Sequence, residues 1–304
     1  MQPLEVSFDY PAVFTVMREH FDAWLVHQAL KAGAVFKEGT CVQGVDFLNN
    51  EYILKTSRGI FRARYLVGAD GAASIIRRSL PFDLNLGLAG TLEAELRPAG
   101  NWGQNHRNTI FLEYGIINHG YIWVFPKKIH LSVGLMSFRP AKKPFNDTLS
   151  AFLKTAGLIP QEIEYRRHAI PFLTRAVNSF HCTKALLVGD AAALTDPLTG
   201  EGIYYALKSA AIAAEVLEKA AGISADLNDY TRAVSEVLVK ELQSARKIAG
   251  IVYPFSGLVH RLILKQPELA RSLIEITHGR GSYNDLHGLM ADLKIFPHHY
   301  LTNI

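Results

Sequence analysis

The spacing of apolar side chains changes along the chain, and each spacing predicts a different kind of element. Residues 16–32 carry apolar side chains at helical intervals and end at Gly33, a residue that often follows a helix. We therefore expect one amphipathic helix near the start. Runs rich in β-branched and aromatic residues follow at 34–45, 52–56 and 60–67, and they predict three short strands.

The middle of the chain has the pattern of an antiparallel sheet. Strand-like runs occupy residues 109–114, 121–126 and 130–136, and one helical segment lies near 148–156. We expect a β-rich domain that is inserted into another domain. The expected boundaries are 1–83 and 181–222 for the first domain, 84–180 for the inserted domain and 223–304 for a helical C-terminal region.

A fully apolar run at residues 185–188 predicts a strand that is covered on both faces. Gly189 and Asp190 follow it, and a loop with glycine and proline then leads into a predicted helix at 203–221. Free N–H groups at a helix start favour negative charge on a ligand, and the Asp190 carboxylate can accept hydrogen bonds from hydroxyl groups. The competing interpretation is a plain strand, turn and helix in which Asp190 is only a helix cap.

Composition restricts the class of protein. The 304 residues are 49% hydrophobic and 20% charged, which excludes a disordered or collagen-like chain. The net charge of +4 is spread along the sequence, so we expect no nucleic acid partner. Cys41 and Cys182 provide neither a disulfide framework nor a metal site, and we expect reduced thiols. Residues 298 and 299, both histidine, are expected to be solvated rather than metal ligands.

The sequence predicts no membrane span. The longest uncharged apolar stretch, residues 248–259, is much shorter than the roughly 20 residues that a span needs. Residues 1–10 do not have the pattern of a secretory signal. We therefore expect a cytoplasmic protein, in which residues 248–259 form either a buried helix or a peripheral contact with a membrane surface.

Two motifs occur in an order that is typical of one superfamily. Residues 66–78 read LVGADGAASIIRR, and residues 186–205 read LLVGDAAALTDPLTGEGIYY. The pair resembles the flavoprotein monooxygenase and geranylgeranyl reductase superfamily. This resemblance implies an α/β, Rossmann-like FAD-binding domain of the para-hydroxybenzoate hydroxylase type. It also implies that the strands at 66–69 and 186–188 share one domain, because one FAD has to meet both motifs.

The resemblance assigns cofactor-binding roles to particular residues. It implies that Asp190 holds the ribityl hydroxyls of FAD and that residues 200–203 lie beside the pyrimidine edge of the flavin. Asp70 and Gly71 are expected to help close the site. Arg18 begins an R-x-x-F-D-x-x-L pattern that resembles a helix of the family whose arginine reaches the flavin. An arginine on the solvated face of an ordinary amphipathic helix would give the same pattern. The expected cofactor-binding residues are Arg18, Asp70, Gly71, Gly189, Asp190, Pro197, Gly200, Glu201, Gly202 and Ile203, with NADPH or another electron donor left open.

One further segment favours a reductase within this superfamily. Residues 121–127, YIWVFPK, resemble a strand of geranylgeranyl reductases, which hydrogenate isoprenoid chains with reduced FAD. Strand alternation places Tyr121, Trp123 and Phe125 on one face, where they are expected to wall a pocket for an isoprenoid or prenyl-lipid substrate. An aromatic core strand has the same pattern. The alternatives are an aromatic or polyene monooxygenase, a halogenase, or a non-catalytic remnant that binds lipid, and no general acid is identifiable.

One feature departs from the superfamily pattern. Its members begin with a strand, a G-x-G-x-x-G turn and a helix, followed by an acidic residue for the ribose. The G-x-G pairs here, Gly200 with Gly202 and Gly279 with Gly281, lack the third glycine. We interpret the chain as an N-terminally truncated flavoprotein or a remnant without catalysis, and we expect these 304 residues alone to retain little FAD.

Overall fold

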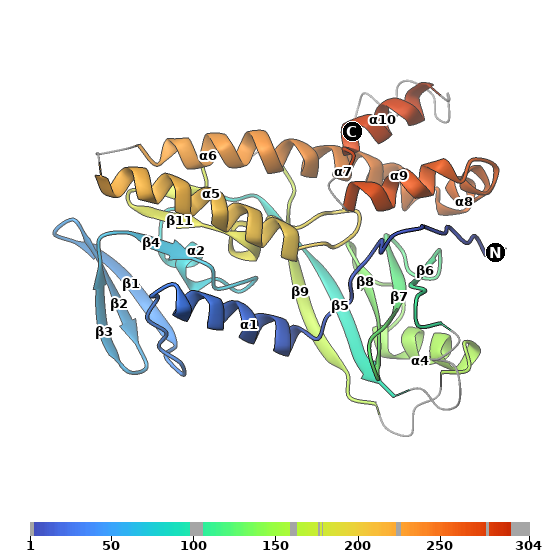
Figure 1. Cartoon of the computed structure of the whole chain (residues 1–304), viewed down its shortest axis with the longest axis horizontal. Helices are drawn as coiled ribbons and strands as arrows, with labels where there is room; N and C mark the ends of the chain where they lie inside the picture. Colours follow the sequence, from blue (N-terminus) through green and yellow to red (C-terminus); the bar gives the residue numbers. More distant parts are fainter. Residues whose placement is uncertain are drawn as a thin grey trace. The chain divides into compact units, whose positions relative to one another are not determined.

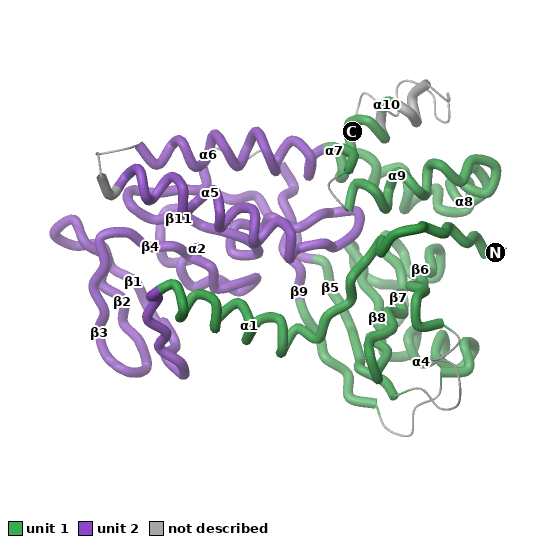
Figure 2. The backbone as a smooth tube through the Cα atoms, in the orientation of Figure 1, with its two compact units in different colours: residues 1–32, 89–168, 244–304 green, residues 33–88, 169–243 purple. Residues whose placement is uncertain are grey.

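The chain forms two compact units, each assembled from segments that are distant in sequence (Figure 2). Unit 1 comprises residues 1–32, 89–168 and 244–304, and unit 2 comprises residues 33–88 and 169–243. The computed structural model describes residues 3–97, 106–158, 163–175, 177, 179–222, 226–277 and 280–292. Gly279, His298 and His299 lie outside the described residues.

A five-stranded sheet with the order β6-β7-β8-β5-β9 dominates unit 1 (Figure 1). The pairs β6–β7, β7–β8 and β5–β8 are antiparallel, so the predicted antiparallel texture is confirmed. The predicted strands at 109–114, 121–126 and 130–136 are also confirmed, with shifts of one or two residues at their ends. The strands are β5 (Leu86–Leu96), β6 (Phe111–Tyr114), β7 (Gly120–Pro126), β8 (Leu131–Ser137) and β9 (Arg166–Leu173).

Strand alternation divides this sheet into an apolar face and an aromatic, polar face. Helix α4 (Phe145–Thr155) covers the apolar face, where Leu92, Ile122 and Val133 are fully buried with Leu149 of the helix. Burial of such side chains is the main stabilising contribution to this layer. Side chains alternate between the two faces along each strand, so the residues between these core positions on β5, β7 and β8 form the opposite face. Trp123 of β7 and Glu93 of β5 are examples.

A three-stranded sheet with the order β10-β11-β4 forms the centre of unit 2. Strands β4 (Leu66–Gly68) and β11 (Ala185–Leu187) pair in parallel, with Val67 opposite Leu186. The prediction that the two motifs share one domain is therefore confirmed. All three residues of β11 are buried, as their apolar run predicts, and β10 spans His181–Cys182. Helix α5 (Ile203–Gly222) confirms the predicted helix after the glycine loop.

The predicted bounds of two strands near the start of the chain are wrong. The run at 34–45 becomes a strand only at Val42, because Gly39 adopts a positive φ of 63° and turns the chain before it. The run at 60–67 is divided between two sheets, since its first half pairs with β2 and its second half pairs with β11. The first sheet is an antiparallel meander of β1 (Val42–Leu48), β2 (Glu51–Thr56) and β3 (Gly59–Ala63).

The remaining elements are helices. The predicted N-terminal helix is confirmed as α1 (Arg18–Lys31), but none of its residues is buried. Among the described residues no single helix is long and apolar enough to cross a membrane, although two consecutive helical segments, bent by 100° at their junction, meet that test together. The others are α2 (Ile75–Ser79), α6 (Asn228–Val234), α7 (Lys240–Val252), α8 (Ser256–Lys265), α9 (Glu268–Thr277) and α10 (Tyr283–Asp292), with a π-helical stretch at Ser235–Val239.

Candidate functional site

Two loops of unit 2 lie together at one edge of its central sheet. Because β4 and β11 are parallel, their carboxyl ends meet at the same edge, which is where open α/β sheets bind ligands. The loop after β4 carries Asp70 and Gly71, and the loop after β11 carries Gly189 and Asp190. The structure therefore brings together four of the residues that the sequence predicted for the cofactor.

Asp70 organises the first loop. Its carboxylate accepts hydrogen bonds from the Ser74 hydroxyl at 2.5 Å and from the backbone N–H groups of Ile75 at 2.7 Å and Ile76 at 3.1 Å. Both carboxylate oxygens are thus used at the start of α2, where the helix dipole stabilises negative charge. Gly71 has a φ of 74°, a conformation that L-residues with a side chain rarely adopt. The hydrogen bonds of Asp70 therefore fix the conformation of the first loop.

Arg77 connects the two loops, and the sequence analysis did not single it out. Its Nη1 donates to the carbonyl oxygens of Asp190 at 3.3 Å and Ala191 at 2.7 Å, and its Nη2 donates to that of Ala72 at 2.6 Å. Partial burial lowers the pKa of Arg77, and the nearby charge of Asp70 opposes this shift. The motif contains two adjacent arginines, Arg77 and Arg78. The sequence alone does not show which of them bonds to the second loop.

Gly189 allows the second loop to approach α5 closely. It has a φ of 53°, and a Cβ at this position would lie 2.9 Å from the Cβ of Ala206. Its N–H donates to the Ser209 hydroxyl at 3.0 Å, and this hydroxyl is itself fully buried. Any larger residue at this position would push the loop away from the helix. Glycine at position 189 therefore lets the backbone of the loop contact α5 directly.

The glycine loop before α5 is ordered by a buried carboxylate. Asp196 is 2% exposed, and it accepts hydrogen bonds from the backbone N–H groups of Leu198 at 2.7 Å and Thr199 at 3.1 Å. The backbone of Asp196 also bonds to that of Gly200 and Glu201. Such Asx turns fix a loop without regular structure. The sequence analysis missed this role of Asp196, although Asp before Pro197 is a known turn signal.

The start of α5 and the Asp190 carboxylate form one cradle. A Cβ on Gly202 would lie 3.4 Å from Asp190 Oδ1, so the absent side chain leaves the backbone next to the carboxylate. Thr195 donates to the same oxygen at 3.3 Å. Within the described part of the chain the N–H groups of Gly202 and Ile203 have no acceptor. The cradle therefore offers one acceptor group and two donors.

Glu201 is the residue that caps α5. Its Oε1 accepts from the Tyr204 N–H at 2.9 Å, so a side chain before the helix satisfies a backbone donor of the first turn. Asp190 instead lies within a short 3₁₀-helix, Gly189–Ala192. The competing interpretation of Asp190 as only a helix cap is therefore wrong.

The predicted substrate residues lie on the aromatic face of the unit 1 sheet. Ring centroids are 6.2 Å apart for Tyr121 and Trp123 and again 6.2 Å apart for Trp123 and Phe125. The expected common face of the three rings is thus confirmed. The Trp123 ring lies across Gly134, where a Cβ would be only 2.2 Å from its Cζ2. Trp123 and Phe125 are half-buried, whereas Tyr121 is buried.

Arg18 belongs to unit 1, whereas the other predicted cofactor residues belong to unit 2. Its guanidinium forms a bidentate pair with Asp22 one turn later, with Nε–Oδ1 at 3.0 Å and Nη2–Oδ2 at 2.9 Å. Both side chains are at least half exposed. Exposed pairs of this spacing contribute little to stability. The predicted flavin contact of Arg18 stays a prediction.

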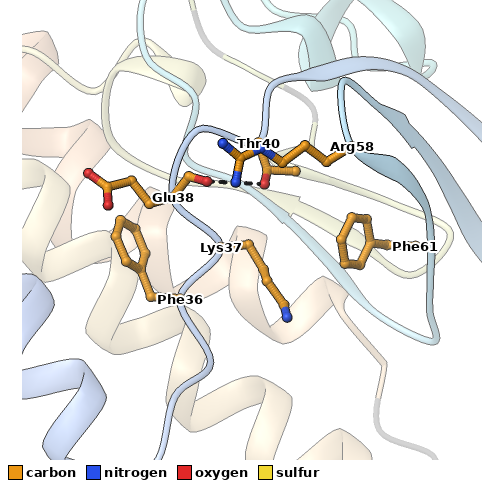
Figure 3. A pocket seen from close by; sticks show the side chains of 6 residues that line it. All are labelled: Phe36, Lys37, Glu38, Thr40, Arg58 and Phe61. Atoms are coloured by element: carbon orange, nitrogen blue, oxygen red, sulfur yellow. Dashed lines mark hydrogen bonds between the residues drawn. The ribbon is translucent and has the colours of Figure 1, made fainter.

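Unit 2 also has a surface pocket of about 390 Å³ that none of the predicted site residues lines. Figure 3 shows the rings of Phe36 and Phe61 on either side of the Lys37 side chain, with Arg58 and Thr40 above them in this view. No group of three or more His, Cys, Asp or Glu side chains suited to a metal ion occurs in the described part of the chain.

Comparisons with known proteins agree with this geometry. A profile of the FAD binding domain matches residues 1–99. An uncharacterized protein of Methanosarcina barkeri is 29% identical over 98% of this chain and 77% of its own length. A digeranylgeranylglycerophospholipid reductase of Methanocaldococcus jannaschii is 30% identical over 283 residues, which cover 86% of this chain and 67% of that protein.

The chain belongs to the geranylgeranyl reductase family of FAD-dependent oxidoreductases. A solved structure agrees on the fold: a geranylgeranyl bacteriochlorophyll reductase-like protein of Thermoplasma acidophilum has a TM-score of 0.64 at 21% identity. That match covers 76% of this chain and 63% of the Thermoplasma chain. The expected fold class of this geranylgeranyl reductase relative, the α/β hydroxylase type, is thereby confirmed.

The cradle of this reductase family member fits the flavin half of FAD. A half-buried carboxylate suits the hydroxyl groups of a ribityl chain, because each hydroxyl can donate to it. Two backbone N–H groups at the start of a 20-residue helix, which have no acceptor among the described residues, suit the electron-rich pyrimidine edge. Gly202 brings the backbone next to this carboxylate, since a Cβ there would already be in van der Waals contact with Asp190 Oδ1.

Proposed function

We propose that this protein reduces carbon–carbon double bonds of isoprenoid chains in a lipid or prenylated precursor, with FAD as its cofactor. The observation that carries the proposal is the aromatic row of Tyr121, Trp123 and Phe125 on a half-buried sheet face in a chain of this family. Its relatives include proteins named digeranylgeranylglycerophospholipid reductase and geranylgeranyl diphosphate reductase. Flat apolar rings suit a long hydrocarbon chain, which has few polar groups to bind.

The flavin would be held by unit 2. Asp190 would accept the ribityl hydroxyls, and the N–H groups of Gly202 and Ile203 would donate to the flavin ring. When bound, FAD supplies the hydride for the alkene. Asp70 and Arg77 would position the two loops without contacting the flavin, because their polar atoms form hydrogen bonds within the loops.

The substrate would be held by the aromatic face of unit 1. The three rings form a continuous apolar row along β7, since each centroid is close to the next. Trp123 is anchored through its Nε1, which lies 3.4 Å from the Ser132 hydroxyl. Such a row excludes water from a bound alkene and orients it, which are the two contributions expected of the protein here.

Product analysis with and without dioxygen tests this proposal against the monooxygenase and halogenase alternatives. The protein is joined to an N-terminal dinucleotide-binding βαβ unit so that it retains FAD. It is then supplied with dithionite and a geranylgeranyl lipid under nitrogen, and the lipid is analysed by mass spectrometry. We expect two hydrogen atoms to be added to each reduced double bond without dioxygen. Products that contain new oxygen or halogen, and that form only in air, would contradict the proposal.

A further inference from the structure

The aromatic face of the unit 1 sheet also carries one pair of ionisable side chains. Leu92 and Ala94 of β5 belong to the buried core beneath α4, so the intervening Glu93 points to the aromatic face. His168 of β9 lies within ion-pair distance, with 3.5 Å between its Nε2 and Glu93 Oε1. Their side chains are 37% and 56% exposed, so both are accessible to water.

Strand register places Glu93 in the same row as Trp123. In the antiparallel ladders Trp123 is opposite Gly134, and Gly134 is opposite Glu93. Since Gly134 has no side chain and the Trp123 ring lies over it, Glu93 is the next side chain in this row. A chain bound along the aromatic row therefore lies beside a carboxyl group.

Two other ion pairs of described residues involve strands of this face. Lys127 Nζ lies 2.6 Å from Glu95 Oε1, and the Lys127 side chain is only 12% exposed. On β9, Arg166 lies 3.8 Å from Glu164. Of these three pairs, Glu93 with His168 is the one that joins a carboxyl group to an imidazole, a combination that transfers protons near neutral pH.

We propose that Glu93 donates the proton in alkene reduction and that His168 restores it from solvent, an inference that rests on the proposed function. The π bond of the alkene breaks, and one carbon takes the hydride that reduced FAD supplies. The electron pair left on the other carbon takes the proton from Glu93, which becomes a carboxylate. His168 returns a proton to that carboxylate and takes one from water, so the alkene gains two electrons and two hydrogens.

The kinetic test compares Glu93→Gln with Glu113→Gln, a matched control. Glu113 lies on β6 of the same sheet but is opposite Ile122, whose side chain belongs to the apolar face. In single-turnover experiments with dithionite-reduced protein, Glu93→Gln should slow transfer to a geranylgeranyl lipid by roughly 100-fold or more, because general acids contribute about that much. His168→Asn should slow it less and alter its pH profile, and Glu113→Gln should match the wild type.

A labelling experiment without flavin tests whether Glu93 touches the lipid. A carbodiimide and an amine label carboxyl groups, and peptide mass spectrometry measures each site with and without a saturated polyprenyl lipid. We expect the lipid to protect Glu93 and not Glu113. Wild-type transfer rates in Glu93→Gln, or equal labelling of Glu93 with and without lipid, would overturn the inference and leave the proposed function standing. If the wild-type protein reduces no prenyl lipid, the proposed function fails and the inference fails with it.

Discussion

Single residues of the candidate site divide into those proposed to bind the cofactor and those that hold the loops. We propose Asp190 and Gly202 for the first role, whereas Asp70, Arg77 and Asp196 hold the backbone of the loops through hydrogen bonds. A motif in the sequence contains both kinds without distinguishing them, because spacing does not show which side chains bond to the backbone of a loop.

Replacing Arg77 should weaken both the fold of unit 2 and its hold on FAD. Arg77→Met removes three hydrogen bonds to backbone carbonyls, and we expect the free energy of unfolding to fall by about 2 kcal/mol. Arg78→Met is the control, since Arg78 makes one exposed contact with a carbonyl, and it should change stability by less than about 0.5 kcal/mol. Urea unfolding and flavin content measure the difference, and equal effects of the two substitutions would contradict the role given to Arg77.

In a protein with a dinucleotide-binding βαβ unit joined to its N-terminus, Trp123→Ala should impair reduction of a long polyprenyl lipid and leave flavin content unchanged. The side chain belongs to unit 1, and its ring forms the centre of the aromatic row. Ile129→Ala provides a control, because Ile129 is an exposed apolar residue in the turn after β7. Steady-state kinetics and flavin absorbance are measured for each variant. Parallel loss of FAD and activity in Trp123→Ala would count against the predicted substrate face.

The two cysteines should differ in reactivity. Cys41 is exposed, whereas burial raises the pKa of the Cys182 thiol to about 11, an effect that a hydrogen bond with Tyr52 partly offsets. At pH 8 only about one Cys182 in a thousand is then a thiolate, which is the nucleophilic form. Iodoacetamide should therefore label Cys41 much faster, as measured by peptide mass spectrometry over time. Similar rates at both sites in the native protein would show that Cys182 is not shielded.

At the scale of elements, the sequence pattern predicts the type of a strand well, but it does not predict which strand it pairs with. The period-2 pattern of β7 and the apolar run of β11 identified a two-faced strand and a buried strand. The run at 60–67 was divided because Leu66 pairs with Ala185, a contact across more than 100 residues that no local pattern contains. Gly39 turns the chain before β1 through its positive φ, whereas Gly44 within β1 is not among the glycines with positive φ, and sequence alone does not separate the two cases.

The fit of Trp123 over β8 can be tested through Gly134. A Cβ there would lie 2.2 Å from Trp123 Cζ2 and 2.7 Å from the Leu92 carbonyl oxygen, so Gly134→Ala should lower stability by roughly 1–3 kcal/mol. Gly257→Ala, in α8 of the same unit, meets no atom within 4 Å and should raise stability slightly. Thermal unfolding of the two variants measures this contrast. A neutral Gly134→Ala variant would contradict the described packing.

At the scale of the whole molecule, the chain leaves unit 2 after Leu88 in β5 and returns to it at Ala169 in β9, so that β11 can pair with β4. Sequence reasoning anticipated this return, because two flavin motifs have to share one site. It did not anticipate that residues 1–32 and 244–304 group with the antiparallel sheet in unit 1, since such grouping depends on tertiary contacts alone. The site residues and the weak retention of FAD by these 304 residues stay predictions.

The central claim is that FAD held by this protein passes a hydride to an isoprenoid double bond. Its most direct test is a single turnover without dioxygen. Dithionite-reduced, FAD-loaded protein with the added N-terminal βαβ unit is mixed with a geranylgeranyl lipid, and the flavin absorbance is recorded. The account predicts that the oxidised flavin spectrum returns as double bonds are reduced, with one alkene reduced for each flavin oxidised. A flavin that stays reduced in the presence of the lipid, and is oxidised only when air is admitted, would contradict it.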